Sequence, residues 1–303
     1  MKIFITGGTG FVGTSLSRSL IQNGYFVTTL TRPSSRQKRL PKEVSVVEGN
    51  SMEPGEWQHY LGDSDVVINL AGASIFQRWN SKNKQLIRTS RVLTTRNIVN
   101  AISLAKDKKI DLINASAVGY YGFHGDEIID EDIPPGNDFL ATVSLDWEAE
   151  ALKAKASGAR VVLCRLGVVL DREGGAMGKL LPLFRLGLGA RLGTGKQWFS
   201  WIHRGDVLGI ILYLLKDRDI EGPINCTSPN PVQNKEMTRL LSRALKRPAF
   251  MPPISGNILR LVLGEFAETL LKGQRVVPKV LNERGFPFIY PDFEDALHDM
   301  ISA

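Results

Sequence analysis

The amino-acid sequence opens with Met1-Lys2-Ile3-Phe4-Ile5-Thr6-Gly7-Gly8-Thr9-Gly10-Phe11-Val12-Gly13-Thr14, and this stretch decides the fold. A short apolar run that ends in glycines is typical of a strand buried in a parallel sheet. The apolar residues Val12, Leu16 and Leu20, followed by Gly24, predict a helix that begins within the glycines. Strand, glycine turn and helix in this order are the setting that a dinucleotide-binding loop requires.

Each glycine of this turn has a predicted task. Gly7 permits the turn, Gly10 lets the backbone approach a pyrophosphate, and Gly13 lets helix and strand pack closely. The first N–H groups of the helix then face the phosphates. The spacing is G-x-x-G-x-x-G rather than G-x-G-x-x-G, and a tight turn without a ligand is the alternative. We expect the diphosphate to be held by Gly7, Gly8, Thr9, Gly10, Phe11, Val12 and Gly13.

The second predicted strand, residues 25–31, bears on the choice of cofactor. An acidic residue after this strand would accept the ribose 2′-OH of NAD, whereas an arginine accommodates the 2′-phosphate of NADP. The chain has Arg32 there, with Thr31 and Ser35 as hydroxyl partners and no carboxylate beside it in the sequence. NADP(H) is therefore the expected cofactor, and a solvated loop arginine is the alternative.

Further strands are expected at 44–47, 66–72, 112–116, 161–169 and 222–227. Several residues at or near their ends are candidate cofactor contacts. The amide of Asn50 could meet the adenine edge, and small residues after the fourth strand leave room for the cofactor. Arg91, on the next helix, faces either solvent or the pyrophosphate. The candidates in this group are Asn50, Leu70, Ala71, Gly72, Arg91, Ser116 and Val169.

Ser116, Tyr120 and Tyr121 leave the carboxyl end of the fifth strand, where open α/β sheets bind ligands. Hydride transfer needs a polarised carbonyl and one proton donor or acceptor. Ser116 could polarise the carbonyl, Tyr120 or Tyr121 could donate the proton, and His203 could shuttle it. The alternatives are a serine bonded to backbone, tyrosines that line the pocket, and a structural histidine.

Composition limits the class of protein. The chain has 303 residues, 43% of them hydrophobic, two cysteines and a formal net charge of +7. These features exclude a disulfide framework and predict no metal site. Neither a nucleic-acid module nor an apolar run of about 18 residues occurs, so we expect neither nucleic acid nor membrane as a partner. No leader segment precedes the first strand, so we expect a cytoplasmic protein.

The domain division expected is an NADP(H)-binding domain at 1–170, with a return segment at about 200–228. A smaller, mostly helical substrate domain would comprise 171–200 and 229–303. Glycines and basic residues alternate through 174–196, which predicts a lid over a substrate pocket.

The motifs together resemble an extended short-chain dehydrogenase/reductase. The general matches are Thr6–Gly13, Asn69–Gly72, Ser116 with Tyr121-Gly122, and Trp201–Val207. More closely, the chain is similar to the atypical "epimerase family" branch. The markers of this branch are Arg78-Trp79, Ser90-Arg91, Ala117–Gly122, Asp146-Trp147-Glu148, Phe184–Gly189, Leu271–Pro278 and Gly285-Phe286. The resemblance implies a Rossmann-type, doubly wound α/β fold of about seven parallel strands with a smaller C-terminal domain.

One departure from the superfamily concerns its working pair, a tyrosine and a lysine four residues later. Aligning on Glu148 puts Leu140 and Ser144 at these positions, and no tyrosine of the chain has a lysine four residues on. The resemblance implies an NADP(H)-dependent oxidoreductase or nucleotide-sugar-epimerase-like enzyme that uses other residues. The alternative is a non-catalytic NADP(H)-sensing module, which would suit the association of some relatives with cell division. The expected partner is a small molecule, either anionic or a nucleotide-sugar, and a homodimer is left open.

Overall fold

The computed structural model describes residues 1–32, 40–105, 108–247 and 251–302. Its centre is a seven-stranded, all-parallel sheet in the order β12-β7-β5-β4-β1-β2-β3. The strands are β1 (Lys2–Thr6), β2 (Phe26–Thr31), β3 (Ser45–Glu48), β4 (Val66–Asn69), β5 (Asp111–Ala117), β7 (Val161–Leu166) and β12 (Gly222–Cys226). The strand order reverses beside β1, which confirms the Rossmann-type arrangement expected from the sequence.

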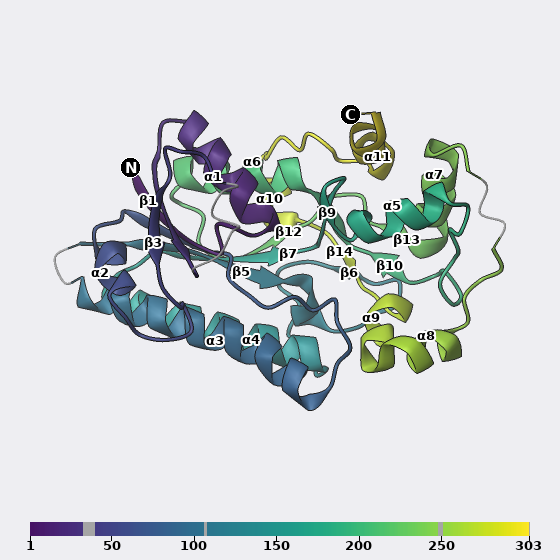
Figure 1. Cartoon of the computed structure of the whole chain (residues 1–303), viewed down its shortest axis with the longest axis horizontal. Coiled ribbons are helices and arrows are strands. Elements are labelled where there is room, and N and C mark those ends of the chain that lie inside the picture. Colours follow the sequence, from purple (N-terminus) through teal and green to yellow (C-terminus); the bar gives the residue numbers. More distant parts are fainter. Residues whose placement is uncertain (33–39, 106–107, 248–250, 303) are drawn as a thin grey trace.

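Helices cover both faces of this sheet because successive strand residues point to opposite sides. Ile3 and Ile5 pack on one side with Leu16 and Leu20, while Phe4 packs on the other. The first side is covered by α1 (Phe11–Gln22) and α6 (Arg204–Lys216), and the second by α2 (Trp57–Gly62), α3 (Ser81–Leu104) and α4 (Phe139–Leu152). These two layers lie above and below the sheet in Figure 1.

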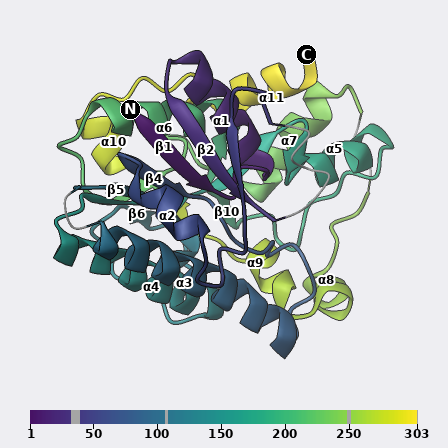
Figure 2. The same cartoon turned by 60° about the vertical axis from the view of Figure 1, so that its left-hand side comes forward.

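A second, smaller core lies beside the sheet. Leu181, Trp201, Leu241 and Phe293 are buried in it. It is built mainly from α5 (Met177–Arg185), α7 (Asn234–Ala244) and α11 (Phe293–Ser302). The other helices of this part are α8 (Gly256–Leu263), η4 (Gly264–Ala267), α9 (Glu268–Leu271) and α10 (Lys279–Glu283). Figure 2 shows α5, α7 and α8 on the far side of the molecule from β5.

Short strands join the two parts. One small sheet has the order β11-β8-β9, and β10 pairs with β13. The strand β14 of the C-terminal part pairs with β6, which follows β5 in the chain. The bounds are β6 (Ile128–Ile129), β8 (Val168–Asp171), β9 (Gly174–Gly175), β10 (Trp198–Phe199), β11 (Trp201–His203), β13 (Val232–Gln233) and β14 (Arg275–Val276). The expected domain boundaries themselves stay a prediction.

The prediction of one strand over 161–169 is wrong. The chain leaves the large sheet after Leu166, and β8 joins β11 of the small sheet. Gly167 lies at the break, where its N–H bonds Cys226 O and the N–H of Val168 bonds Ser200 O. A Cβ on Gly167 would lie 2.8 Å from Ser200 O, so only glycine fits this crossing point. The fourth strand is also shorter than expected and ends at Asn69.

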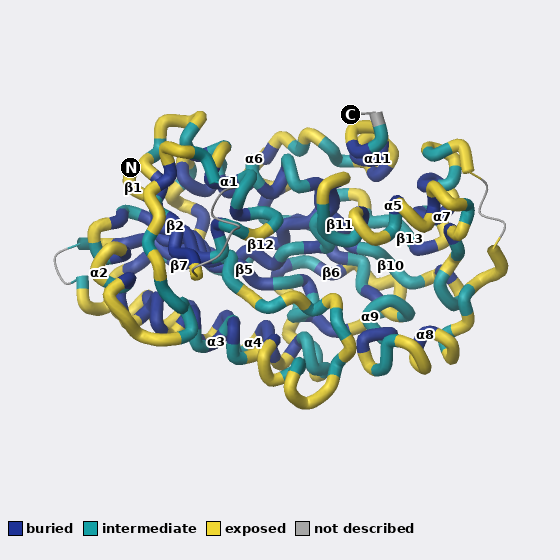
Figure 3. The backbone as a smooth tube through the Cα atoms, viewed as in Figure 1, coloured by how far each residue is buried: buried dark blue, intermediate teal, exposed yellow. Residues whose placement is uncertain are grey.

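The helix expected at 143–156 begins earlier, at Phe139. Asp138 caps it, because its carboxylate accepts a hydrogen bond from Ala141 N at 2.9 Å. A 3₁₀ turn, η3 (Lys153–Ser157), continues to Gly158, which ends the helical stretch with a φ of 75°. The central strands of the large sheet are largely buried, whereas the outward turns of the surrounding helices are exposed (Figure 3). Among the described residues, no helix is both long and apolar enough to cross a bilayer.

Candidate functional site

The glycine turn lies between the carboxyl end of β1 and the first turn of α1. Gly7 has a φ of 77°, and a Cβ there would lie 2.7 Å from Leu70 C. A Cβ on Gly13 would lie 2.3 Å from Gly7 O, whereas one on Gly10 would meet only that oxygen, at 3.0 Å. Gly7 and Gly13 are therefore required by the turn itself, and Gly10 is left on the open side. No side chain caps α1 at Gly10, so its first N–H groups remain available to an anion.

Asn69 links the ends of β1, β4 and β5 through side-chain hydrogen bonds. Its Oδ1 accepts from Thr6 Oγ1 at 2.6 Å, and its Nδ2 donates to Asn114 Oδ1 at 2.7 Å. The same Oδ1 also accepts from Ala71 N at 3.2 Å, which directs the chain after β4 along the edge of the sheet. Asn69 and Asn114 are fully buried. This network stabilises the carboxyl edge of the sheet, next to which the glycine turn lies.

Arg91 lies beside this edge rather than in solvent. Its Nη1 donates to Ala73 O at 3.0 Å and to Ile87 O at 2.9 Å. Within the described part of the chain it forms no ion pair, and burial lowers the pKa of its guanidinium to about 10. A Cβ on Gly72 would lie 3.1 Å from Arg91 Cζ. The guanidinium of Arg91 therefore occupies the space that a side chain at position 72 would need. A partly buried guanidinium without a carboxylate partner is well suited to bind a phosphate.

At the end of β2, where the adenosine ribose of the cofactor is expected to bind, the structure shows a carboxylate that the sequence did not reveal. Register pairs Thr31 of β2 with Glu48 of β3, so a carboxylate stands on the neighbouring strand near Arg32. Asn50 is engaged locally, because its Nδ2 donates to Glu53 Oε1 at 2.7 Å. One N–H of this amide is therefore used inside the protein, and the contact predicted for Asn50 with adenine stays a prediction. The predicted contact of Ser35 lies outside the described residues.

Ser116 belongs to a buried network at the carboxyl ends of β5 and β7. Its hydroxyl donates to Glu148 Oε1 at 2.6 Å. Arg165 binds both oxygens of Glu148, each at 2.9 Å, and these three residues are at most 4% exposed. Burial alone would lower the pKa of Arg165, but its bonds to Glu148 outweigh this and raise it. The geometry therefore supports a structural role for Ser116, and the carbonyl contact stays a prediction.

Tyr120 and Tyr121 differ in the hydrogen bonds of their hydroxyl groups. Tyr121 is fully buried, donates to Asn225 Oδ1 at 2.7 Å and accepts from Arg165 Nη1 at 2.9 Å. Burial raises the pKa of Tyr121 to about 12, so it is a poor proton donor at neutral pH. Tyr120 is partly exposed, with its ring 3.5 Å from the Arg165 guanidinium carbon. Its hydroxyl has no partner among the described residues, and it is the predicted donor that remains open to a ligand.

The helix after β5 presents apolar carbon where the superfamily has its tyrosine. A Cβ on Gly119, just beyond β5, would lie 3.2 Å from Leu140 Cβ. Ser144, one turn further along α4, is buried. Leu140 thus lies next to the turn that follows β5, where the alignment on Glu148 puts the tyrosine of the superfamily. Neither Leu140 nor Ser144 can transfer a proton as a tyrosine–lysine pair would.

His203 caps α6 and lies away from these hydroxyls. Its Nδ1 accepts from Gly205 N at 3.1 Å, and its ring centroid is 4.0 Å from that of Tyr290. Burial lowers the pKa of His203, which favours the neutral ring. Its Nε2 lies 3.4 Å from Asp299 Oδ2. These contacts are those of a structural histidine, the alternative to the predicted proton shuttle.

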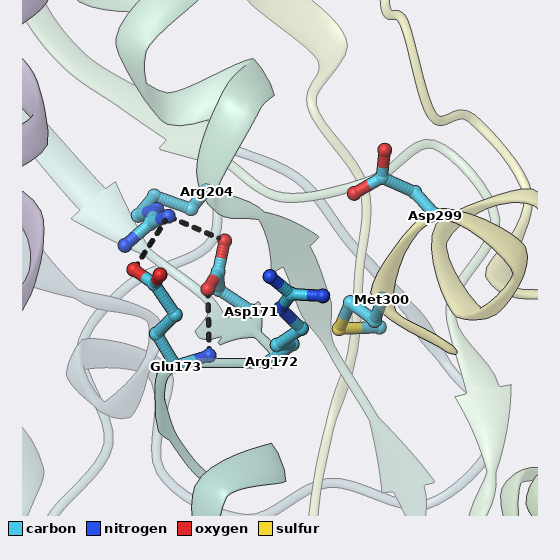
Figure 4. Close-up of a pocket in the computed structure, with 6 residues that line it drawn as sticks. All are labelled: Asp171, Arg172, Glu173, Arg204, Asp299 and Met300. Carbon is cyan, nitrogen blue, oxygen red and sulfur yellow. Dashed lines mark hydrogen bonds and ion pairs between the residues drawn. The ribbon is translucent and has the colours of Figure 1, made fainter. Parts of the chain in front are cut away.

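A hairpin that follows β8 lies against the first residue of α1. A Cβ on Gly174 would lie 2.6 Å from Phe11 Cδ2, so the hairpin backbone rests directly on the Phe11 ring. Arg204 holds the hairpin through Asp171 at 2.8 Å and Glu173 at 3.5 Å. Figure 4 shows this ion cluster. Its residues line a solvent-open hollow of about 180 Å³. Val169, a predicted cofactor contact, lies on β8 at the base of the same hairpin.

Sequence reasoning missed the buried partners of the predicted residues. Glu148, Arg165 and Asn225 have no sequence signal beyond the marker Asp146-Trp147-Glu148, because their partners are 17 to 104 residues away. Arg165 lies in the interior of the strand that the sequence predicts over 161–169. A charged residue in a predicted buried strand is itself a signal that a buried counter-charge must exist.

One member of this network predicts a pH dependence. Glu131 Oε1 accepts from Asn225 N at 2.9 Å, but Glu131 Oε2 is buried with no partner. Burial raises the pKa of Glu131, so the neutral carboxyl stabilises the fold at low pH and this contribution falls as pH rises through the raised pKa. Glu131→Gln keeps the accepting oxygen and carries no charge. We expect its melting temperature to exceed that of the wild type increasingly from about pH 4 upward, as measured by thermal unfolding at several pH values. A constant difference across this range would contradict the assignment.

The turn, the strand order and the position of α1 define a Rossmann-fold protein of the dinucleotide-binding class. The model of the NAD dependent epimerase/dehydratase family matches residues 3–227, and this chain belongs to that family. A domain of unknown function, DUF1731, matches residues 256–300.

Relatives of the same kind match along the whole chain. An Arabidopsis thaliana protein, "Epimerase family protein SDR39U1 homolog, chloroplastic", is 39% identical over 98% of this chain and 86% of its own length. The Bacillus subtilis "Epimerase family protein YfhF" is 39% identical over 100% of this chain and 98% of its own. The crystal structure of human epimerase family protein SDR39U1 (isoform 2) with NADPH has a TM-score of 0.87 at 33% identity, covering 100% of this chain and 99% of that one.

Proposed function

We propose that this protein binds NADP(H) at the carboxyl edge of the large sheet, with the diphosphate at the first turn of α1. The observation that carries the proposal is the pairing of an uncapped helix start at Gly10 with Arg91, which is partly buried and has no ion pair with a described carboxylate. Both supply positive charge on the same edge, and a diphosphate carries the matching negative charge. The human relative whose structure contains NADPH supports this choice of ligand.

The preference for NADP(H) over NAD(H) is proposed to come from Arg32. We expect NADPH to bind about tenfold or more tightly than NADH, because a guanidinium stabilises the 2′-phosphate. Arg32→Ala should narrow this ratio, and calorimetric titration of both cofactors measures it. Glu48→Gln is the informative companion, since removal of the carboxylate opposite Thr31 should increase the preference. Equal affinity of the wild type for both cofactors would contradict the role of Arg32.

The reaction proposed is an NADP(H)-dependent oxidoreduction, or an epimerase-like variant of it, on a small carbonyl or hydroxyl compound. When bound, the cofactor supplies the hydride chemistry. Tyr120 is the proposed proton donor, because the hydroxyls of Ser116 and Tyr121 are already engaged inside the protein. Tyr120→Phe should abolish turnover while NADPH affinity stays unchanged.

A substrate with an anionic or nucleotide-sugar character is proposed for the region outside the strands. Lys179 of α5 is exposed, and its Nζ lies 5.2 Å from the centroid of the Phe76 ring, which follows β4. Trp79, Phe139 and Phe266 form an aromatic cluster next to Phe76. Aromatic carbon beside a cation suits a planar, negatively charged ligand.

An NADP(H)-sensing module without catalysis is the second candidate function. The apolar contact of Leu140 with the turn that follows β5 favours it, since this position carries no proton-transfer group. Oxidation of NADPH should be followed against a panel of carbonyl compounds, with Tyr120→Phe as the matched variant. Turnover that depends on Tyr120 supports the enzyme, whereas silence across the panel with cofactor bound supports the module.

A further inference from the structure

One end of the molecule is free of acidic residues over two long segments. Residues 174–205 and residues 237–264 each contain five Lys or Arg and no Asp or Glu. The segments are adjacent in space, because Gly193 N bonds Ile254 O and Ile254 N bonds Arg191 O, each at 2.9 Å. They include α5, most of α7, and α8, which lie together at the end opposite the amino-terminal strands (Figures 1 and 2). We call the exposed, described residues of these segments the basic end.

Much of the positive charge of the basic end is uncompensated. Arg239 and Arg260 are neutralised by Glu236 and Glu268, which lie just outside the two segments. Six other cations are exposed, and the structure gives none of them an ion pair with any described residue. These are Lys179, Arg185, Arg191, Lys196, Lys246 and Arg247.

The basic end also exposes aliphatic carbon. On α8, Ile258, Leu261 and Val262 are 55%, 81% and 63% exposed, and their spacing puts them on one face of the helix. Leu259 is turned the other way and is buried. Leu186, beyond the last turn of α5, is 74% exposed. Seven of the nineteen large hydrophobic side chains that are exposed in the described chain lie in these two segments, so the apolar surface is concentrated where acidic residues are absent.

We propose that the basic end docks on an anionic phospholipid surface. An amphipathic helix with exposed aliphatic residues enters the boundary between headgroups and acyl chains, and surrounding Lys and Arg are attracted to anionic headgroups. A second copy of the chain is a poor occupant, because a symmetric contact would bring two sets of unpaired cations together. Nucleic acid is a poor occupant because the exposed carbon is aliphatic, and aliphatic side chains do not stack on bases.

This docking requires no spanning segment. The expectation of no membrane partner rested on the absence of a long apolar run, and a helix that lies in the interface needs none. The proposal is also independent of the cofactor, since none of the residues that carry it belongs to the dinucleotide edge.

Vesicle co-sedimentation of the full chain tests the proposal. We expect binding to phosphatidylcholine vesicles that contain about one third phosphatidylglycerol to be at least about tenfold tighter than binding to phosphatidylcholine alone. Raising the salt from about 0.05 to about 0.5 M should weaken it strongly. Leu261→Ser and the pair Arg185→Glu with Arg191→Glu should each reduce binding about tenfold.

Matched controls lie elsewhere on the surface. Leu104 is 73% exposed at the end of α3, and Leu104→Ser should leave vesicle binding unchanged, as should Lys216→Glu at the end of α6. Unfolding temperatures of all variants verify that each is folded. Equal binding to both kinds of vesicle, binding to neither, or equal losses in the control variants would overturn the proposal. Concentration-dependent dimerisation lost in Leu261→Ser, without vesicle binding, would assign the face to a second copy instead.

Discussion

Gly13→Ala is expected to weaken NADPH binding, with an increase in Kd of about tenfold to a hundredfold. The added Cβ would lie 2.3 Å from Gly7 O and 2.6 Å from Gly8 Cα, and both are backbone atoms that no rotamer change can move. Helix α1 must shift away from the turn, which removes its N–H groups from the diphosphate. A forced shift of this kind costs on the order of 1–3 kcal/mol, enough for about a tenfold to a hundredfold loss of affinity. Calorimetric titration with NADPH measures it.

The control for this substitution is Gly62→Ala at the end of α2, where an added Cβ would have nothing within 4 Å. It should leave both NADPH affinity and melting temperature close to those of the wild type. Helix propensity alone favours alanine at both positions by about 1 kcal/mol. A Gly13→Ala protein that binds NADPH like the wild type would therefore show that the turn does not hold the cofactor.

Glu148→Ala is expected to cause the largest loss of stability among single substitutions in the Ser116–Glu148–Arg165 network. It leaves Arg165, which is 3% exposed, without its counter-charge. Removing one partner of a buried ion pair costs about 3–5 kcal/mol. The hydroxyl of Ser116 loses its acceptor at the same time. Urea denaturation, with ΔG of unfolding extrapolated to water, measures the loss.

Two further variants serve as controls for Glu148→Ala. Arg239→Ala breaks an exposed pair with Glu236 and should leave the unfolding midpoint unchanged. Glu148→Ala combined with Arg165→Leu should recover part of the loss, because the uncompensated charge is gone. Equal effects of Glu148→Ala and Arg239→Ala would show that the buried network does not contribute to stability as its geometry indicates.

The sequence predicted the sheet well because each signal was local. Glycines in the turn, apolar pentamers and the stop at Gly24 act within a few residues of one another, and the observed β1 and α1 follow them. The break at Gly167 could not be predicted in this way. It depends on the approach of Ser200, which is distant in the sequence.

In the candidate site too, features that depend on neighbouring residues were predictable, and contacts between distant residues were not. The glycine turn and the position of Arg91 on α3 followed from motif spacing. The partners of Ser116 and Tyr121 could not be predicted from the sequence, because Glu148 and Asn225 lie on other elements. The catalytic roles of these two residues stay predictions. The carboxylate of Glu48 beside Thr31 is likewise visible only once strand register is known.

The most direct test of the central claim is a crystal structure of the protein grown with NADPH. We predict that its diphosphate lies within hydrogen-bonding distance of backbone N–H groups of the first turn of α1 and of the Arg91 guanidinium, with the 2′-phosphate at Arg32. A structure in which the cofactor binds away from this edge, or in which the edge stays closed at saturating NADPH, would contradict the account.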